Sequence, residues 1–158
     1  MEYILAEKQR DCFLCSAMDQ ESDREGLVLY RGQSCFTLMN RYPYNNGHCM
    51  VVPYRHVSDL TDLTEDECLS LMLSVRDCKA VLQREINADG FNVGINLGKA
   101  AGAGLEEHLH VHIVPRWSGD TNFMPVTAGI KVMPQDLYAL YDQLLPAFAA
   151  LPSCQSES

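Results

Sequence analysis

Basic residues and long apolar runs are both scarce in this chain. Its 158 residues include 12 Lys and Arg against 21 Asp and Glu, and the formal net charge at pH 7 is -9. This balance disfavours binding along a nucleic-acid backbone, because that binding mode needs Lys and Arg to displace counterions. It does not exclude a small anionic ligand, since a nest of backbone N–H groups holds phosphate whatever the global charge.

The sequence also lacks the segments that direct proteins into or across membranes. No apolar run is long enough to span a bilayer, and no charged segment followed by an apolar stretch opens the chain. Its seven cysteines are an odd number in a chain large enough to fold without disulfides, which favours reduced thiols. We therefore expect a cytoplasmic protein with neither a membrane nor a nucleic-acid partner.

No internal repeat and no low-complexity linker divides the chain. Its length and its 47% of hydrophobic residues fit one domain with one core. We expect this single domain to cover residues 1–152, followed by a polar C-terminal tail over residues 153–158.

The apolar pattern predicts an α+β fold with a mainly antiparallel sheet. Strand-like patterns between turn residues occur in five segments: 27–30, 35–40, 48–53, 91–97 and 108–115. A long helix from about residue 64 to about residue 87 separates the third segment from the fourth, and Thr64 with Glu67 forms a capping-box signature at its start. A second amphipathic helix is expected over residues 137–148, where Pro146 should kink or end it. Strands grouped on both sides of a long helix differ from the regular alternation of a parallel fold.

Three histidines alternate with apolar residues in the last of these segments. Alternate side chains of a strand share a face, so His108, His110 and His112 should project together from an exposed face, roughly 6.5–7 Å apart. A polar face without chemistry is one alternative, and a metal site that uses all three imidazoles is another. Three ligands along one straight strand diverge from a shared centre, so the pattern favours catalysis.

A loop of small residues precedes the histidines. Residues 98–104 read GKAAGAG, and a backbone with so little side-chain bulk can approach a phosphate closely and direct N–H groups at its oxygens. Such loops also simply turn corners. The position of this one, directly upstream of the alternating histidines, indicates phosphate binding.

At residues 108–114, the run HLHVHIV resembles the signature of the histidine-triad (HIT) superfamily. Residues 39–41 (MNR) and 47–53 (GHCMVVP) are similar to the early strand–loop–strand segment of that family, and the likeness covers roughly residues 10–120. Residues 115–123 (PRWSGDTNF) resemble the fragile-histidine-triad branch and bacterial diadenosine-polyphosphate phosphorylases. The resemblance implies a HIT-like fold with a five-stranded sheet, one long helix and one C-terminal helix. It also implies a homodimer that acts on nucleoside polyphosphates.

The resemblance further implies different roles for two of the histidines. His110 would attack the α-phosphorus and form a nucleotidyl-histidine intermediate, which water, phosphate or another acceptor then resolves. Its other ring nitrogen is expected to donate to a backbone carbonyl, that of His108. His112 would lie near the bridging oxygen and assist the leaving group.

Other positions match substrate-binding residues of the family. These positions are Asn40, His48, Asn96, Ala103, Gly104, Leu105 and His112. Asn40 would hold the ribose hydroxyls, Asn96 and the backbone of residues 103–105 would contact phosphate, and His48 would support the active-site edge. Gly104 departs from the family pattern, because hydrolases carry Gln there and related phosphorylases carry Ser. The sequence therefore leaves hydrolysis and phosphorolysis both open.

A Cys-x-x-Cys segment, Cys12 and Cys15, lies near the N-terminus. On its own such a pair fits a zinc site, a redox pair or two buried thiols. Some bacterial HIT proteins bind structural zinc through such a pair, the histidine after the third strand and the first histidine of the triad. The matching positions here are His56 and His108, so the resemblance implies one Zn²⁺ per subunit in a closed site. His108 would then be a metal ligand and not a catalyst.

The predicted function is that of a HIT-type dinucleoside-polyphosphate hydrolase or phosphorylase, a nucleotidyl hydrolase or transferase that acts through His110. A nucleoside phosphoramidase is an alternative within the same class. A nucleotide-binding signalling module with weak catalysis is an alternative from another class, and a redox role of the Cys12–Cys15 pair is a third. Loss of turnover with retained binding in His110→Asn would separate the enzyme from the binding module.

Overall fold

The computed structural model describes residues 12–103, 107–120 and 135–152. Its elements in chain order are α2 (Phe13–Met18), α3 (Asp23–Gly26), β1 (Val28–Arg31), β2 (Cys35–Met39), β3 (Cys49–Pro53), η1 (Leu60–Asp62), α4 (Glu65–Ile86), β4 (Gly90–Gly94), η2 (Lys99–Ala101), β5 (Val111–Arg116) and α6 (Leu137–Ala149). None of the helices in these ranges combines the length and the apolarity needed to cross a membrane.

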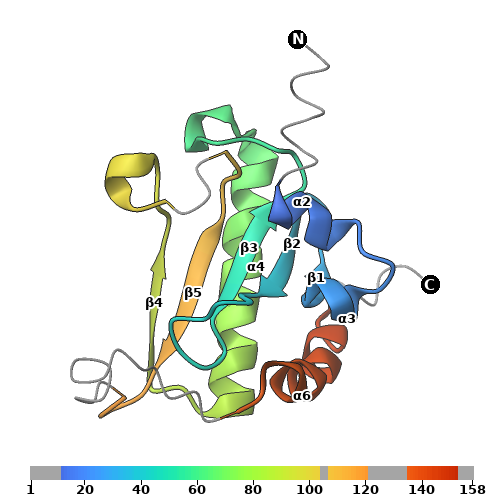
Figure 1. Ribbon diagram of the computed structural model, residues 1–158, viewed down its shortest axis with the longest axis vertical. Coiled ribbons are helices and arrows are strands. Elements are labelled where there is room, and N and C mark those ends of the chain that lie inside the picture. The colour runs from blue at the N-terminus through green and yellow to red at the C-terminus, as the bar shows by residue number, and fades with distance from the viewer. Residues whose placement is uncertain (1–11, 104–106, 121–134, 153–158) are drawn as a thin grey trace.

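One antiparallel sheet holds all five strands, in the order β1-β2-β3-β5-β4 (Figure 1). The first three strands pair in sequence order, and the connection through α4 leads to β4 at the far edge. The chain then returns along β5, which inserts between β4 and β3 and places His112 opposite Met50. The arrangement confirms the predicted α+β fold with a five-stranded antiparallel sheet, one long helix and a C-terminal helix.

The long helix α4 begins at the predicted capping box. The Thr64 hydroxyl accepts from the Glu67 N–H at 3.2 Å, and the Glu67 carboxylate accepts from the Thr64 N–H at 2.9 Å. The Arg55 guanidinium donates to the same carboxylate through bonds of 2.6 and 2.7 Å. These bonds, those from Arg55 first, lower the pKa of Glu67 to about 2. Arg55 therefore ties the segment that follows β3 to the start of α4.

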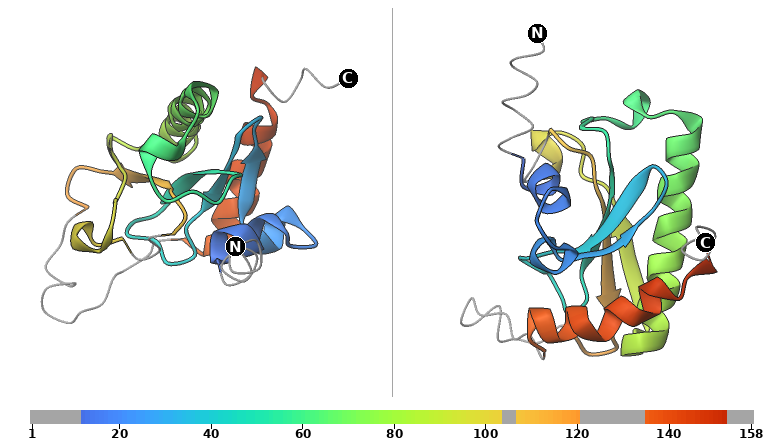
Figure 2. Two further views of the ribbon diagram at one scale, coloured as in Figure 1. Left: turned by 90° about the horizontal axis from the view of Figure 1, so that it is seen from above. Right: turned by 90° about the vertical axis from the view of Figure 1, so that its right-hand side faces the viewer.

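The sheet is covered by helices on one face, where α4 crosses the central strands and α6 packs on β1 (Figure 2). Leu144 and Phe148 of α6 are fully buried in this core. The other face carries a second apolar cluster, in which Met50 and Val52 of β3 meet Leu14 of α2. Strand β3 is buried along its whole length, because both of its faces are covered.

Two short helices near the N-terminus, α2 and α3, are absent from the sequence-based prediction. The six residues of α2 are too few to form a stable isolated helix, and burial of Leu14 and Cys15 against the sheet holds them in place. In α3 the Ser22 hydroxyl accepts from the Glu25 N–H and caps the first turn. Tertiary packing, which a local pattern does not report, therefore decides the first of these helices.

Element boundaries differ from the prediction at two places that matter. Strand β5 begins at Val111, so His108 and His110 belong to the segment that precedes it. Of the two outcomes expected at Pro146, an end of the helix is wrong, because α6 continues through this residue to Ala149, while a kink stays a prediction. Phe148, which is 1% exposed, lies beyond the proline, and its burial offsets the hydrogen bond that the proline nitrogen cannot donate.

Candidate active site and metal centre

His110 is buried, and among the described residues only one of its two ring nitrogens has a hydrogen-bond partner. Its Nδ1 lies 2.8 Å from the carbonyl oxygen of His108. A carbonyl can only accept, so Nδ1 carries the proton and Nε2 keeps its lone pair. The structure thus contains the bond to His108 that the sequence analysis expects, and the free nitrogen has the electronic state that a nucleophile needs.

A chain of hydrogen bonds sets the tautomers of His48 and His112. The Tyr44 N–H donates to His48 Nδ1 at 3.0 Å, so the proton of this imidazole sits on Nε2. His48 Nε2 lies 2.9 Å from His112 Nδ1 and donates to it. The proton of His112 is therefore on Nε2, and this nitrogen can donate to an oxygen outside the protein. Burial, followed by the charge of His110, lowers the pKa of His112 to about 4 and keeps its imidazole neutral.

The rings of His110 and His112 lie together, with centroids 4.7 Å apart. The expectation that all three histidines project from an exposed face is wrong, because His108 is 0% exposed and His110 only 7% exposed. The His108 ring packs against His56 at 4.7 Å. The alternating histidines therefore belong to two neighbouring sites: His108 lies with His56, and His110 lies with His112.

The predicted metal ligands Cys12, Cys15, His56 and His108 lie in one cluster, with all four ligand atoms within 4.8 Å of one another. His108 Nδ1 is 3.4 Å from Cys12 Sγ and 3.5 Å from Cys15 Sγ, and His56 Nδ1 is 3.4 Å from Cys15 Sγ. Zinc bonds of about 2.3 Å to sulfur and about 2.0–2.1 Å to nitrogen place tetrahedral S and N ligands about 3.5 Å apart. The cluster can therefore hold a metal ion with little movement of its side chains.

The surroundings of this cluster also suit a metal ion. His108 Nε2 donates to the Pro53 carbonyl at 2.9 Å, which orients Nδ1 toward the thiols, as is usual for a ligating histidine. Burial lowers the pKa of His108 to about 4, so its imidazole is neutral. Burial, and then the neighbouring Cys12, raise the pKa of Cys15 to about 12. A thiolate pair here would need a cation beside it, and a divalent metal supplies that charge.

A pocket of about 260 Å³ lies next to α2, on the face of the sheet opposite α4. We call it the α2 pocket; its lining includes Phe13, Ser16, Leu38, Asn40 and Met50. The Asn40 side chain points its oxygen at the Tyr42 N–H, 2.8 Å away, and its amide nitrogen contacts the Met50 sulfur at 3.7 Å. Gln20, Glu25 and Arg41 add polar and charged groups to a lining that is otherwise mainly apolar. Such a slot suits a flat ring that carries a polar sugar.

Comparison with known proteins bears on this site. A family model described as the HIT domain matches residues 21–119. The chain belongs to the HIT family. An AP-4-A phosphorylase of Mycobacterium tuberculosis is 53% identical over 116 residues, which cover 73% of this chain and 60% of that protein. The matched region thus spans about three fifths of that relative.

Two further HIT proteins extend the comparison. A bis(5'-adenosyl)-triphosphatase of Dictyostelium discoideum is 37% identical over 93 residues, which cover 59% of this chain and 62% of that protein. The crystal structure of a Zn-bound histidine triad family protein from Mycobacterium smegmatis is 25% identical and has a TM-score of 0.71. That likeness covers 93% of this chain and 99% of the other.

Other substrate-binding positions expected of a HIT protein lie between β4 and the histidines, in residues 96–105. Gly94 pairs with His112 in antiparallel register, so the chain direction carries Asn96 toward His110. Asn96 and Ala103 are half-buried in this segment. Gly104 and Leu105 lie outside the described residues.

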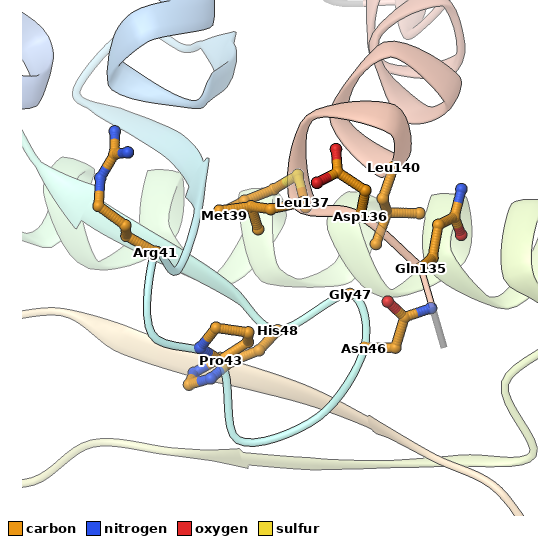
Figure 3. A pocket seen from close by; sticks show the side chains of 10 residues that line it. All are labelled: Met39, Arg41, Pro43, Asn46, Gly47, His48, Gln135, Asp136, Leu137 and Leu140. Atoms are coloured by element: carbon orange, nitrogen blue, oxygen red, sulfur yellow. The ribbon is translucent and has the colours of Figure 1, made fainter. Parts of the chain in front are cut away.

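A second pocket, of about 410 Å³, lies where the loop before β3 meets the start of α6 (Figure 3). Met39 and Leu140 contribute apolar side chains to its lining, while Arg41 and Asp136 contribute charged groups. His48 reaches its edge and is the one predicted site residue among the side chains that line it. The loop that carries His48 and the start of α6 therefore share this pocket.

The sequence does not reveal Tyr44, whose ring lies beside those of His48 and His112. Its ring lies 4.8 Å from the His48 ring and 5.9 Å from the His112 ring, and its backbone N–H sets the His48 tautomer. In the sequence, Tyr44 differs from other loop residues only in its position four residues before His48. The turn between the two residues brings the Tyr44 N–H to the His48 imidazole. A backbone donor leaves no trace in residue type, so the pattern alone does not reveal it.

Proposed function

We propose that the protein is a HIT-type enzyme that cleaves dinucleoside polyphosphates, such as diadenosine tetraphosphate, through a nucleotidyl-histidine intermediate on His110. The bond from His110 Nδ1 to the His108 carbonyl carries the proposal, because it leaves the Nε2 lone pair free next to the proton donor of His112. The names of two relatives, AP-4-A phosphorylase and bis(5'-adenosyl)-triphosphatase, support this substrate class.

In the first step, His110 Nε2 attacks the α-phosphorus. A P–N bond forms, and the bond from phosphorus to the bridging oxygen breaks. The oxygen leaves with that electron pair, and the Nε2–H of His112 stabilises it by a hydrogen bond. The imidazole on phosphorus becomes cationic, and its Nδ1–H stays bonded to the His108 carbonyl, which stabilises this charge.

In the second step, an acceptor oxygen attacks the same phosphorus. The P–N bond breaks, its electron pair returns to His110 Nε2, and the acceptor releases a proton. With diadenosine tetraphosphate, water as acceptor gives AMP and ATP, and phosphate gives ADP and ATP. Gly104 offers only a backbone N–H where relatives present a side chain, so its residue type leaves both acceptors open.

The substrate would lie across the face of the sheet opposite α4. The transferred nucleoside would occupy the α2 pocket, with its ribose hydroxyls at Asn40. Asn96 and the backbone of residues 103–105 would contact the phosphates. His48 would hold the tautomer of His112 and would not itself touch the reacting atoms.

The test is product analysis of a diadenosine tetraphosphate digest with and without inorganic phosphate. We expect wild type to give either AMP and ATP or, with phosphate, ADP and ATP. His110→Asn should give neither pair. Equal turnover by His110→Asn would refute the covalent mechanism. Nucleotide binding without turnover under any acceptor would instead favour a binding module, and faster cleavage of a nucleoside phosphoramidate than of diadenosine tetraphosphate would favour a phosphoramidase.

We further propose that the ion of the Cys12, Cys15, His56 and His108 cluster is zinc and that it is structural. Two thiolates and two imidazoles form a closed set that leaves no ligand position open for water, and a relative of similar fold is zinc-bound. Metal analysis of protein purified without added zinc should give about one zinc per chain. Protein that is folded and active but contains no zinc would contradict this proposal.

We also propose a cytoplasmic homodimer formed by one domain over residues 1–152. In the sheet that the described residues form, β4 is an edge strand, and its Val93 is 49% exposed. Leu97 beyond it and Met72 on α4 are also exposed, at 37% and 66%. An edge with unpaired backbone groups and apolar side chains suits pairing with a second copy. Sedimentation of wild type at twice the monomer mass, and of Val93→Lys at the monomer mass, would support the dimer.

A further inference from the structure

His108 takes part in both sites through different atoms. Its ring nitrogen Nδ1 lies among the metal ligands, 3.4 Å from Cys12 Sγ. Its backbone carbonyl accepts the Nδ1–H of His110 at 2.8 Å. One residue thus connects the metal cluster to the atom that sets the tautomer and the orientation of His110.

The helix α2 connects the same cluster to the α2 pocket. Cys12 precedes the helix and Cys15 lies within it, while Phe13 and Ser16 of the same turns line the pocket. Only Leu14 and Cys15 of this helix are buried. Six residues form a stable helix only when something outside the helix holds them. A metal bound by both thiols would fix α2 at its N-cap residue and at one residue within it, about one turn apart.

We propose that the metal centre is a positioning clamp, which through His108 sets His110 for attack and through Cys12 and Cys15 holds α2 as a wall of the nucleoside pocket. The ion supplies no chemistry to the reaction; it orders two parts of the site that are distant in sequence. The assignment of the α2 pocket to a nucleoside rests on the proposed function. Removal of the ion should therefore weaken nucleotide binding and loosen His110, even where the sheet stays folded.

The experiment compares wild type with His56→Ala, a variant that removes one ligand and leaves the residues of α2 and His108 themselves unchanged. The affinity for AMP is measured by calorimetry, and the tautomer of His110 by NMR of ¹⁵N-histidine-labelled protein. We expect His56→Ala to lose the metal, to bind AMP at least about tenfold more weakly, and to show His110 in exchange between tautomers. In wild type the His110 signals should report a single form with the proton on Nδ1.

Two further variants separate the clamp from general damage. His56→Cys restores a ligand at the same place, so it should recover metal binding and, with it, AMP affinity relative to His56→Ala. Cys68→Ser changes an exposed thiol on α4, outside the site, and should match wild type in both measurements. If His56→Ala does not fold, the zinc and cadmium forms of wild type are compared. The longer bonds of cadmium to sulfur should then shift the His110 signals more than those of His48.

A folded, metal-free His56→Ala that binds AMP as wild type does and keeps the His110 tautomer would overturn the clamp. Identical His110 signals in the zinc and cadmium forms would also overturn it. Neither measurement needs turnover. A protein that shows both metal-dependent effects but does not cleave diadenosine tetraphosphate would keep the clamp and refute the proposed enzyme.

Discussion

The five described imidazoles form two neighbouring groups, and their Nδ1 atoms have different kinds of partner. In the thiol group, His56 and His108 direct Nδ1 at the sulfur atoms of Cys12 and Cys15. In the relay group, His48, His110 and His112 have Nδ1 atoms bonded to a backbone N–H, a backbone carbonyl and another imidazole respectively. The partner of Nδ1, and not the place in the alternating pattern, therefore decides what each histidine can do.

Burial acts alike on one member of each group. It lowers the pKa of both His108 and His112 to about 4, so both are neutral near pH 7. In His108 the neutral form exposes a lone pair to a metal ion. In His112 it carries a proton on Nε2, which the bond from His48 leaves free to donate. Burial therefore favours metal binding by His108 and hydrogen-bond donation by His112, because it keeps both imidazoles neutral.

The largest effect in the relay group is expected for His110→Asn. The amide cannot form the covalent bond to phosphorus, so kcat for diadenosine tetraphosphate should fall by about 10³-fold or more. Binding of AMP should change by less than about threefold, because this residue acts in the covalent step. Steady-state kinetics and calorimetry check both results. A variant with wild-type kcat would remove His110 from the reaction.

In the thiol group, Cys15→Ser should give the largest loss of stability. It opens the closed ligand set and leaves a hydroxyl among buried sulfur atoms, at a cost of about 3 kcal/mol. For a domain of this size that corresponds to a fall in Tm of roughly 6–12 °C. The matched control is Cys68→Ser, an exposed thiol, which should stay within about 1–2 °C of wild type. Equal Tm values for the two variants would show that the cluster does not stabilise the fold.

A smaller effect is expected for His48→Leu, which removes the donor to His112 Nδ1. The His112 proton can then move to Nδ1, and kcat should fall by about 10–100-fold with KM little changed. His48→Gln places an amide N–H near the former Nε2 and should lose less. Steady-state kinetics of both variants test this. If the two are equally impaired, the effect of His48 is one of packing and not of the hydrogen bond.

The smallest effect concerns pH. An imidazole in the unfolded chain titrates near 6.5, while the pKa of His112 in the folded protein is lowered to about 4. Between these values the unfolded state binds more protons, so the contribution of a neutral His112 to stability is complete above pH 6.5. It is lost as the pH falls toward 4.

Urea unfolding of wild type and His112→Asn between pH 7.5 and pH 4.5 measures this contribution. The difference in free energy of unfolding between the two proteins should shift against wild type as the pH falls. His108 and the other titrating groups are common to both proteins, so their contributions cancel. A difference that does not vary with pH would contradict the lowered pKa of His112.

Much of the fold follows from local patterns in the sequence. The capping box of Thr64 and Glu67 predicts the start of α4, and strand-like patterns predict all five strands. The helix α2 was not predicted, since its six residues depend on burial against Met50 and Val52 rather than on their own propensity. The expectation that the helix could end at Pro146 is wrong, because the burial of Phe148 lies outside a local pattern.

For the site, the chain's residues define the available chemistry: three alternating histidines, a Cys-x-x-Cys pair and a loop of small residues. The division of the imidazoles between two sites follows from tertiary contacts. Cys12 and His108 are 96 residues apart, and His48 and His112 are 64 apart. The contact between His48 and His112 depends on the pairing of β5 with β3, and that between Cys12 and His108 on the packing of α2 against the sheet. Residue type sets what a ring nitrogen can donate or accept, but the nearest atom in the folded chain decides which of these it does.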